Sequence, residues 1–275
     1  MNKKVRRPEK AYHNKRFLNS PDARPIRILA EYVEPLERFE EFQVDDTILV
    51  FGSARIVSRE AAEAAVKEAG RNGGALNGNL AQAKRQLEMS RYYEDTRALA
   101  RRLTEWSKGI GEGGRRFVIC TGGGPGIMEA ANRGASEAKG ENIGLGISLK
   151  SGEPANSYIT HRLNFEFHYF FMRKFWFLYL AKAAIIMPGG FGTFDELMEL
   201  LTLIQTEKVR KKLPIVLYGG EFWDKVIDFE AMVDCGVIAP HDPELFHRSD
   251  SVDDALEFIT AELEKSGLAE PGGSL

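Results

Sequence analysis

RFVICTGGGPGIMEAANRGASEAKG, residues 116–140, runs from an apolar segment through a glycine cluster into a segment rich in Ala and Glu. The apolar residues at 116–121 predict a strand, and the residues after the glycines predict a helix. Glycines at such a junction let the backbone approach a ligand and aim N–H groups at an anion, in front of the helix dipole. A purely structural tight turn is the alternative explanation of the cluster.

The same order of strand, loop and helix recurs along the chain. Each run is apolar at nearly every position, which suits strands buried on both faces of a parallel sheet. We therefore predict an α/β fold with a doubly wound parallel sheet and helices on both faces, forming one domain over residues 46–268. The other runs that predict strands are TILVF within 47–55, IGLGISL at 143–149, AAIIM at 183–187 and PIVLY at 214–218.

Segments outside the sheet are expected to be helical or loosely attached. Residues 1–45 are predicted to form a basic arm and a helical extension, with the helix over 29–42 broken or kinked at Pro35. A helical insertion is expected at about 58–95, and residues 269–275 form a tail. Residues 1–27 carry a net charge of +7 within a chain of net charge -3. A solvated arm is the simpler interpretation, and contact with an anion is the alternative.

Composition narrows the class of protein. Hydrophobic residues make up 43% of the 275 residues, which excludes a disordered chain or a fibre. The two cysteines, Cys120 and Cys235, show neither a disulfide framework nor a metal-binding spacing, so we predict no metal and a reducing, cytoplasmic location. The apolar stretch at 175–187 is too short to span a bilayer.

A second glycine loop, PGGFGT at 188–193, joins the AAIIM strand to a helix. Glycines 189, 190 and 192 leave backbone donors uncovered, and Thr193 can add a hydroxyl to a bound phosphate. The loop lacks the GK[ST] of a P-loop, so a monophosphate fits better than a triphosphate. The alternative is a capping box formed by Thr193 and Glu196.

Further candidate residues lie in the first glycine loop and in the helix predicted over 167–182. The first loop does not match a dinucleotide fingerprint, but Gly123, Gly124, Gly126 and Met128 are expected to bind substrate. In the helix, Arg173 and Lys174 lie among aromatic residues, where burying a cation without a partner is costly. Either they meet a phosphate or the carboxylate of Glu196, or they extend to solvent, which suits Lys174 better.

These motifs resemble those of the LOG family of nucleoside 5'-monophosphate phosphoribohydrolases, often labelled "lysine decarboxylase-like". The resemblance covers roughly 47–262 and points to the longer subgroup. The motifs that carry it are PGGFGTFDE at 188–196, MRK at 172–174 and GGGPGIMEAANRGA at 122–135, supported by FGSAR at 51–55 and TLIQT at 202–206.

The resemblance implies a Rossmann-like fold, a homodimer and hydrolysis of the N-glycosidic bond of AMP or a cytokinin riboside 5'-monophosphate. No cofactor is implied. It assigns Arg173 and Glu196 as the catalytic pair and places Gly190, Gly192 and Thr193 at the phosphate. Ser53, Lys174 and Gly189 are expected to contribute to substrate binding. A base pocket is expected from Met128, Phe171 and Met172, although such side chains also suit a core.

Two other functions are alternatives to hydrolysis. A pyridoxal phosphate-dependent decarboxylase needs a Schiff-base lysine, for which Lys174 or Lys182 are candidates, but no other part of such a site is recognisable. A non-catalytic nucleotide sensor or carrier would use both glycine loops without hydrolysis, and the presence of both Arg173 and Glu196 argues against it. Membrane and nucleic-acid partners are not expected.

Overall fold

The computed structural model describes residues 8–71, 77–110, 115–149, 152, 154–268 and 271–273. Within them, seven strands form one parallel sheet in the order β4-β3-β2-β1-β5-β6-β7. The strands are β1 (Thr47–Phe51), β2 (Val118–Thr121), β3 (Asn142–Ile147), β4 (Asn164–Phe167), β5 (Ala181–Ile186), β6 (Ile215–Tyr218) and β7 (His247–Ser249). The predicted α/β class with a parallel sheet is confirmed.

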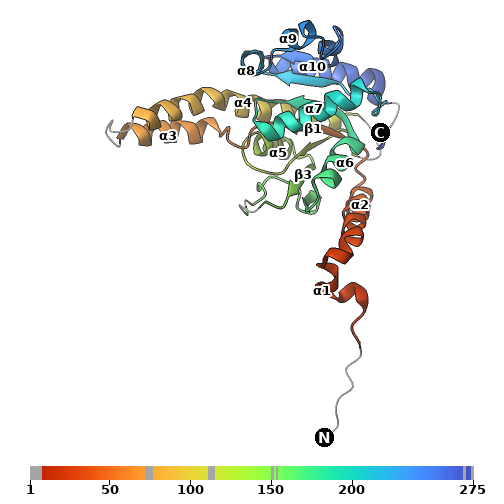
Figure 1. Ribbon diagram of the computed structural model, residues 1–275. Helices are drawn as coiled ribbons and strands as arrows, with labels where there is room; N and C mark the ends of the chain where they lie inside the picture. The colour runs from red at the N-terminus through yellow and green to blue at the C-terminus, as the bar shows by residue number, and fades with distance from the viewer. Residues whose placement is uncertain are drawn as a thin grey trace.

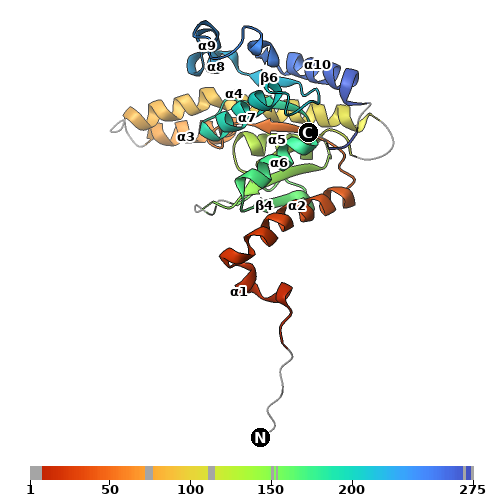
Figure 2. The ribbon, with the colours of Figure 1, turned by 45° about the vertical axis from the view of Figure 1, so that its right-hand side comes forward.

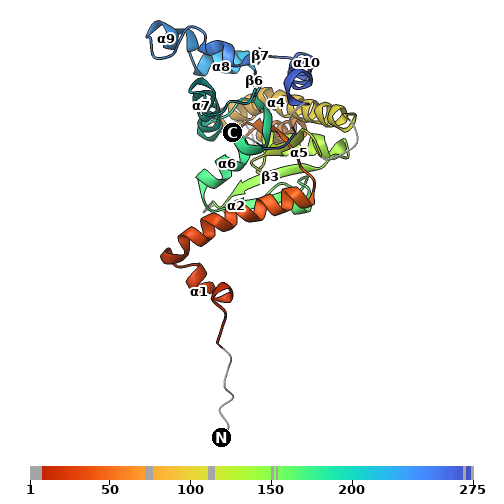
Figure 3. The ribbon, with the colours of Figure 1, turned by 90° about the vertical axis from the view of Figure 1, so that its right-hand side faces the viewer.

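Helices cover both faces of the sheet, as a doubly wound fold requires (Figure 3). One face carries α2, α6 and α7, and the opposite face carries α4, α5 and α10. The helices are α1 (Lys15–Leu18), α2 (Arg24–Glu41), α3 (Arg59–Arg71), α4 (Asn77–Lys108), α5 (Ile127–Glu137), α6 (Phe170–Leu180), α7 (Phe191–Gln205), α8 (Gly220–Val226), α9 (Phe229–Asp234) and α10 (Val252–Glu262).

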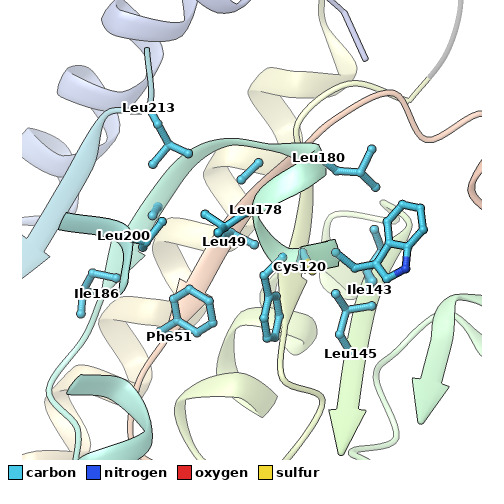
Figure 4. Packing of buried hydrophobic residues seen from close by; sticks show 14 of the residues in the cluster. Leu49, Phe51, Cys120, Ile143, Leu145, Leu178, Leu180, Ile186, Leu200 and Leu213 are labelled. Atoms are coloured by element: carbon cyan, nitrogen blue, oxygen red, sulfur yellow. The ribbon is translucent and has the colours of Figure 1, made fainter. Parts of the chain in front are cut away.

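Alternate residues of each central strand enter two separate hydrophobic cores. In β1, Leu49 and Phe51 pack beneath α6 and α7 (Figure 4), whereas Ile48 and Val50 belong to the core beneath α4, α5 and α10. All five residues of β1 are buried. This two-sided burial explains why the central strands read as continuous apolar runs.

The two edge strands, β4 and β7, were missed in the sequence. Strand β4 alternates exposed and buried residues, and β7 is a three-residue strand of polar side chains. Neither forms the continuous apolar run that marks a strand buried on both faces. The boundaries of the aromatic helix were also wrong, because residue 167 ends β4 and residues 181 and 182 begin β5.

Helices α3 and α4 pack side by side, and the end of α3 and the start of α4 project from the body (Figure 1). The second part of α4 packs against α5 and α10, so it serves as the crossover helix between β1 and β2. Only α3 and the start of α4 extend beyond the sheet. The interruption read at 71–79 lies largely outside the described residues.

Helix α2 continues through Pro35, contrary to a break at that position. Proline has no N–H to bond the carbonyl of Glu31, four residues earlier. The indole N–H of Trp176 donates to that carbonyl instead, at 2.9 Å. The Glu31 carboxylate also accepts from the backbone N–H groups of His168 and Tyr169, just before α6. These bonds attach the helical extension to the body.

The N-terminal segment before α2 extends away from the domain (Figure 2). Short helical turns at Ala11–His13, Lys15–Leu18 and Pro21–Ala23 give it local order. The first seven residues of the predicted arm, and residues 269, 270, 274 and 275 of the predicted tail, lie outside the described residues. No helix in the described ranges is long and apolar enough to cross a membrane.

Candidate active site

A cavity of about 610 Å³ lies at the carboxyl ends of β1 and β5. The strand order reverses between β1 and β5, and doubly wound proteins bind ligands at such a switch point. Its walls come from the loop after β1, from α6 and from the start of α7. The lining residues are Phe51, Gly52, Ser53, Ala54, Arg55, Gly122, Met128, Arg173, Phe177, Gly190, Phe191, Gly192, Thr193, Phe194 and Glu196.

The first turn of α7 opens into this cavity. Gly190 is the N-cap, so Thr193 is the third helical residue and the capping box considered from the sequence does not form. A Cβ on Gly190 or Gly192 would meet nothing within 4 Å, which leaves the backbone accessible from the cavity. A Cβ on Gly189 would lie 2.0 Å from the Thr193 hydroxyl, so Gly189 makes room for that side chain. This is a helix N-terminus suited to an anion.

Glu196, one turn further along α7, is 7% exposed and meets two cations from α6. Its Oε1 lies 3.5 Å from Nη2 of Arg173, and its Oε2 lies 3.4 Å from Nζ of Lys174. Lys174 also contacts Asp195 at 2.9 Å and Glu199 at 2.5 Å. Lys174 is therefore held in a carboxylate cluster and does not extend to solvent, contrary to that alternative.

Two buried polar atoms of residues that line the cavity have no hydrogen-bond partner among the described residues. They are Oε1 of Glu196 and Nε of Arg173. Leaving such groups unsatisfied costs about 1–3 kcal/mol each, so natural proteins rarely bury them without a role. Both atoms belong to side chains that line the first cavity, so the unsatisfied donor and acceptor lie in its wall.

Burial raises the pKa of Glu196 above its ordinary value, with Lys174 and Arg173 opposing that shift. Burial likewise lowers the pKa of Arg173, against the attraction of Glu196 and Asp195. Burial also acts to lower the pKa of Lys174, but its hydrogen bonds to Glu199 and Asp195 outweigh this and raise it. Carboxyl groups with such perturbed pKa values are concentrated at functional sites.

A second cavity, of about 580 Å³, adjoins the first. Ala54, Gly122, Met128 and Arg173 line both. The second cavity extends over the first glycine loop and the ends of β3 and β4. Its other lining residues are Gly123, Gly124, Pro125, Gly146, Ile147, Leu149, Gly152, Pro154, Ala155, Asn164, Phe165 and Glu166.

Buried polar side chains hold the first glycine loop in place. The N–H of Gly123 donates to Thr121 Oγ1 at 2.9 Å, and this hydroxyl donates to Asn132 Oδ1 at 2.8 Å. Asn156 Nδ2 donates to Asn132 Oδ1 and to the carbonyls of Gly123 and Gly124, at 2.9 to 3.1 Å. The loop is therefore a rigid wall between the two cavities.

Most of the predicted site residues come together around these cavities. Ser53, Met128, Arg173, Gly190, Gly192, Thr193 and Glu196 line the first, and Gly123 and Gly124 line the second. Gly126, Gly189 and Lys174 line neither. Gly126 has φ +71 and lies so close to the β1 loop that a Cβ would be 2.4 Å from the Ser53 carbonyl, so its role is structural.

The base pocket predicted from three side chains is only partly formed. Met128 lines both cavities, whereas Met172 is buried in the core and Phe171 is 55% exposed and lines neither cavity.

Two residues at the cavities were missed in the sequence. Arg55 lines the first cavity and was not singled out, although it ends the FGSAR motif. Asn156 was also missed, because a single amide in a loop carries no pattern.

The lysines needed for a pyridoxal phosphate site are poorly placed. Lys174 is bound by three carboxylates, and Lys182 is buried near the amino end of β5, at the opposite end of the strand from the cavities. Neither lysine lines a cavity. Within the described residues, no group of His, Cys, Asp and Glu is arranged to hold a metal ion.

The fold and this site define a Rossmann-like α/β protein with its candidate site at the switch point of the sheet. A family model described as "Possible lysine decarboxylase" matches residues 128–259. The match confirms the predicted resemblance to the LOG family, whose members often carry that older label.

Comparison with individual proteins gives matches to part of the chain and to the fold. The pyrimidine/purine nucleotide 5'-monophosphate nucleosidase of Escherichia coli K12 is 32% identical over 117 residues, covering 38% of this chain and 25% of the relative. The match thus spans about a quarter of that relative's length.

Among solved structures, the structural genomics target TM1055 aligns at 18% identity and a TM-score of 0.47, covering 78% of this chain and 99% of its own. The molybdenum cofactor carrier protein of Chlamydomonas reinhardtii aligns at 16% identity and a TM-score of 0.44, covering 80% of this chain and 99% of its own.

Proposed function

We propose that this protein hydrolyses the N-glycosidic bond of a purine nucleoside 5'-monophosphate, such as AMP or a cytokinin riboside 5'-monophosphate. The products are free base and ribose 5-phosphate. The observation that carries the proposal is the buried Glu196, which faces Arg173 one helical turn from an open helix N-terminus in the same cavity. The related nucleosidase of Escherichia coli supports the same reaction class.

The phosphate group binds at the start of α7. Backbone N–H groups and the helix dipole favour an anion at Gly190 and Gly192, and the Thr193 hydroxyl lines the same space. Arg55 lines the same cavity, and no ion pair of this side chain is found within the described residues. We assign it as the cation that neutralises the phosphate. Binding energy at the phosphate then positions the sugar for reaction.

The sugar lies beside Glu196. When the C1'–N bond breaks, its electron pair leaves with the base and positive charge develops on the ribose. The ionised carboxylate of Glu196 stabilises this charge in a site with little water, where electrostatic interactions are strong. A water molecule supplies the oxygen that bonds to C1'.

The departing base gains one proton. Asp195 and Glu199 were candidates for the donor, but both contact Lys174 and neither lines a cavity. We therefore assign the proton to water. Arg173 lines both cavities and lies within 3.5 Å of Glu196, so it orients the carboxylate and contacts the nucleotide.

Nucleotides are expected to react far faster than nucleosides. AMP should yield adenine, whereas adenosine should yield little, because it lacks the group that the α7 N-terminus binds. Chromatography of free base from both compounds at equal concentrations checks this. Equal turnover of adenosine would contradict the phosphate site.

As the pH is lowered, activity should fall at a pH above the pKa of an ordinary glutamate. Burial raises the pKa of Glu196 above 4.5, so protonation removes the required negative charge at a higher pH than for an exposed side chain. The pH dependence of kcat/KM measures this acidic limb. A profile that stays flat down to pH 4.5 would contradict the role of Glu196.

Binding without turnover is the competing function. A sensor or carrier would hold the nucleotide in the same cavities and release it intact. A panel of purine nucleoside monophosphates, analysed for both base and intact nucleotide, separates hydrolysis from binding alone.

The homodimer implied by the resemblance stays a prediction, as does the cytoplasmic location.

A further inference from the structure

We propose that the second cavity receives the base and that Glu166 makes the site selective for guanine, so that GMP is preferred to IMP and AMP. The inference rests on the proposed function, because it assigns the base end of the same nucleotide. It concerns Glu166 on β4 and Ser148 after β3, and neither residue takes part in the chemistry proposed above.

The position of the second cavity places it at the base end of the substrate. Phosphate and sugar lie in the first cavity, beside Thr193 and Glu196. Met128 and Arg173 line both cavities, so a nucleotide with its sugar at Arg173 extends its base past Met128 into the second cavity.

The walls of the second cavity suit a flat heteroaromatic ring. Met128 and Ile147 supply apolar surface, and the rigid glycine loop supplies a backbone wall. Apolar walls with a few placed polar groups are the usual composition of small-ligand sites.

Among the described residues that line this cavity, Glu166 is the acidic one. The alternation along β4 buries its neighbours Phe165 and Phe167 and leaves Glu166 exposed on the other side of the strand. The Ser148 hydroxyl donates to Glu166 Oε1 at 2.8 Å and orients the carboxylate. Among the ion pairs of the described residues, none involves Glu166. Oε2 is left for a ligand, and Oε1 keeps a second lone pair beside the bond from Ser148, so both oxygens can accept from a base.

An ionised carboxylate only accepts hydrogen bonds, so it selects a base edge that presents donors. Guanine presents two adjacent donors, N1–H and the exocyclic 2-amino group, which match the two oxygens of one carboxylate. Hypoxanthine lacks the 2-amino group. Adenine presents an acceptor at N1, which faces the carboxylate unfavourably. Glu166 therefore favours guanine over both other purines.

GMP and IMP test this most sharply, since they differ only in the 2-amino group. For the full-length wild-type chain, kcat/KM is expected to be about tenfold higher for GMP, the low end for a hydrogen bond to a charged group because Glu166 is exposed. Glu166→Gln should bring the ratio close to one. The amide can pair with adenine through one donor and one acceptor, so the AMP to GMP ratio should rise.

Controls separate recognition from folding. Glu37→Gln on the exposed face of α2 should leave the GMP to IMP ratio unchanged, and Ser148→Ala should lower it partly by releasing the carboxylate. Melting temperatures of all variants show whether they fold. If Glu166→Gln does not fold, Ser148→Ala still tests the proposal.

The outcomes are distinguishable. Release of base with equal kcat/KM for GMP and IMP, or an unchanged ratio in Glu166→Gln, would overturn the selectivity while leaving the proposed function intact. Failure to release base from any nucleotide would overturn the proposed function itself and, with it, this inference.

Discussion

Glu196→Gln is expected to lower kcat/KM for AMP by about a hundredfold or more, the range found when one stabilising group is removed from a reacting centre. The substitution removes the charge that opposes the developing cation but keeps nearly the same shape. Because the carboxyl is buried and its pKa is raised, the neutral amide should be tolerated by the fold. Steady-state kinetics and thermal melting of the same sample measure both effects.

A matched control is Glu257→Gln on the exposed face of α10, which should keep full activity. The opposite pattern, an early-melting Glu196→Gln protein that retains turnover, would show that Glu196 serves the fold alone.

Arg173→Ala is expected to lower kcat/KM by a similar factor of about a hundred. Arg173 lines both cavities, faces Glu196 and leaves its Nε without a partner within the described residues. Arg173→Lys should recover little of the loss, because an ammonium group lacks the planar fork of donors. Kinetics of both variants across a range of AMP concentrations measure this loss in kcat and KM.

Arg210→Ala, at an exposed position after α7, is the matched control and should keep its activity. Lys174→Ala should lose less activity than Arg173→Ala, since Lys174 lines neither cavity and affects the reaction only through its ion pair with Glu196. An Arg173→Ala protein with full activity would support a sensor in place of the enzyme.

The central part of the fold could be predicted from the sequence because burial on both faces leaves a strong pattern. The runs around β1, β2, β3, β5 and β6 are apolar at nearly every position, and each was identified. Strand β4 carries Glu166 on an exposed side, so its alternating pattern at the edge of the sheet went unrecognised. The break considered at Pro35 does not occur, and it could not be excluded from the sequence because the compensating N–H belongs to Trp176, 145 residues after Glu31.

The candidate site could be predicted where glycine loops and charged residues fall at strand ends. Arg173 and Glu196 meet as expected, because α6 precedes β5 and α7 follows it. The position of Lys174 was harder to predict from the sequence, since it depends on Asp195 and Glu199 both contacting its ammonium group. The second cavity was not predicted, because one of its walls belongs to β4.

The most direct test of the proposed function is to quantify both products from one reaction. Purified full-length protein is incubated with AMP, and with GMP in parallel, and free base and ribose 5-phosphate are measured over time. We predict that both products appear in equal amounts as the nucleotide disappears, and that neither forms with Glu196→Gln. Bound nucleotide that is recovered intact, with no ribose 5-phosphate, would contradict hydrolysis.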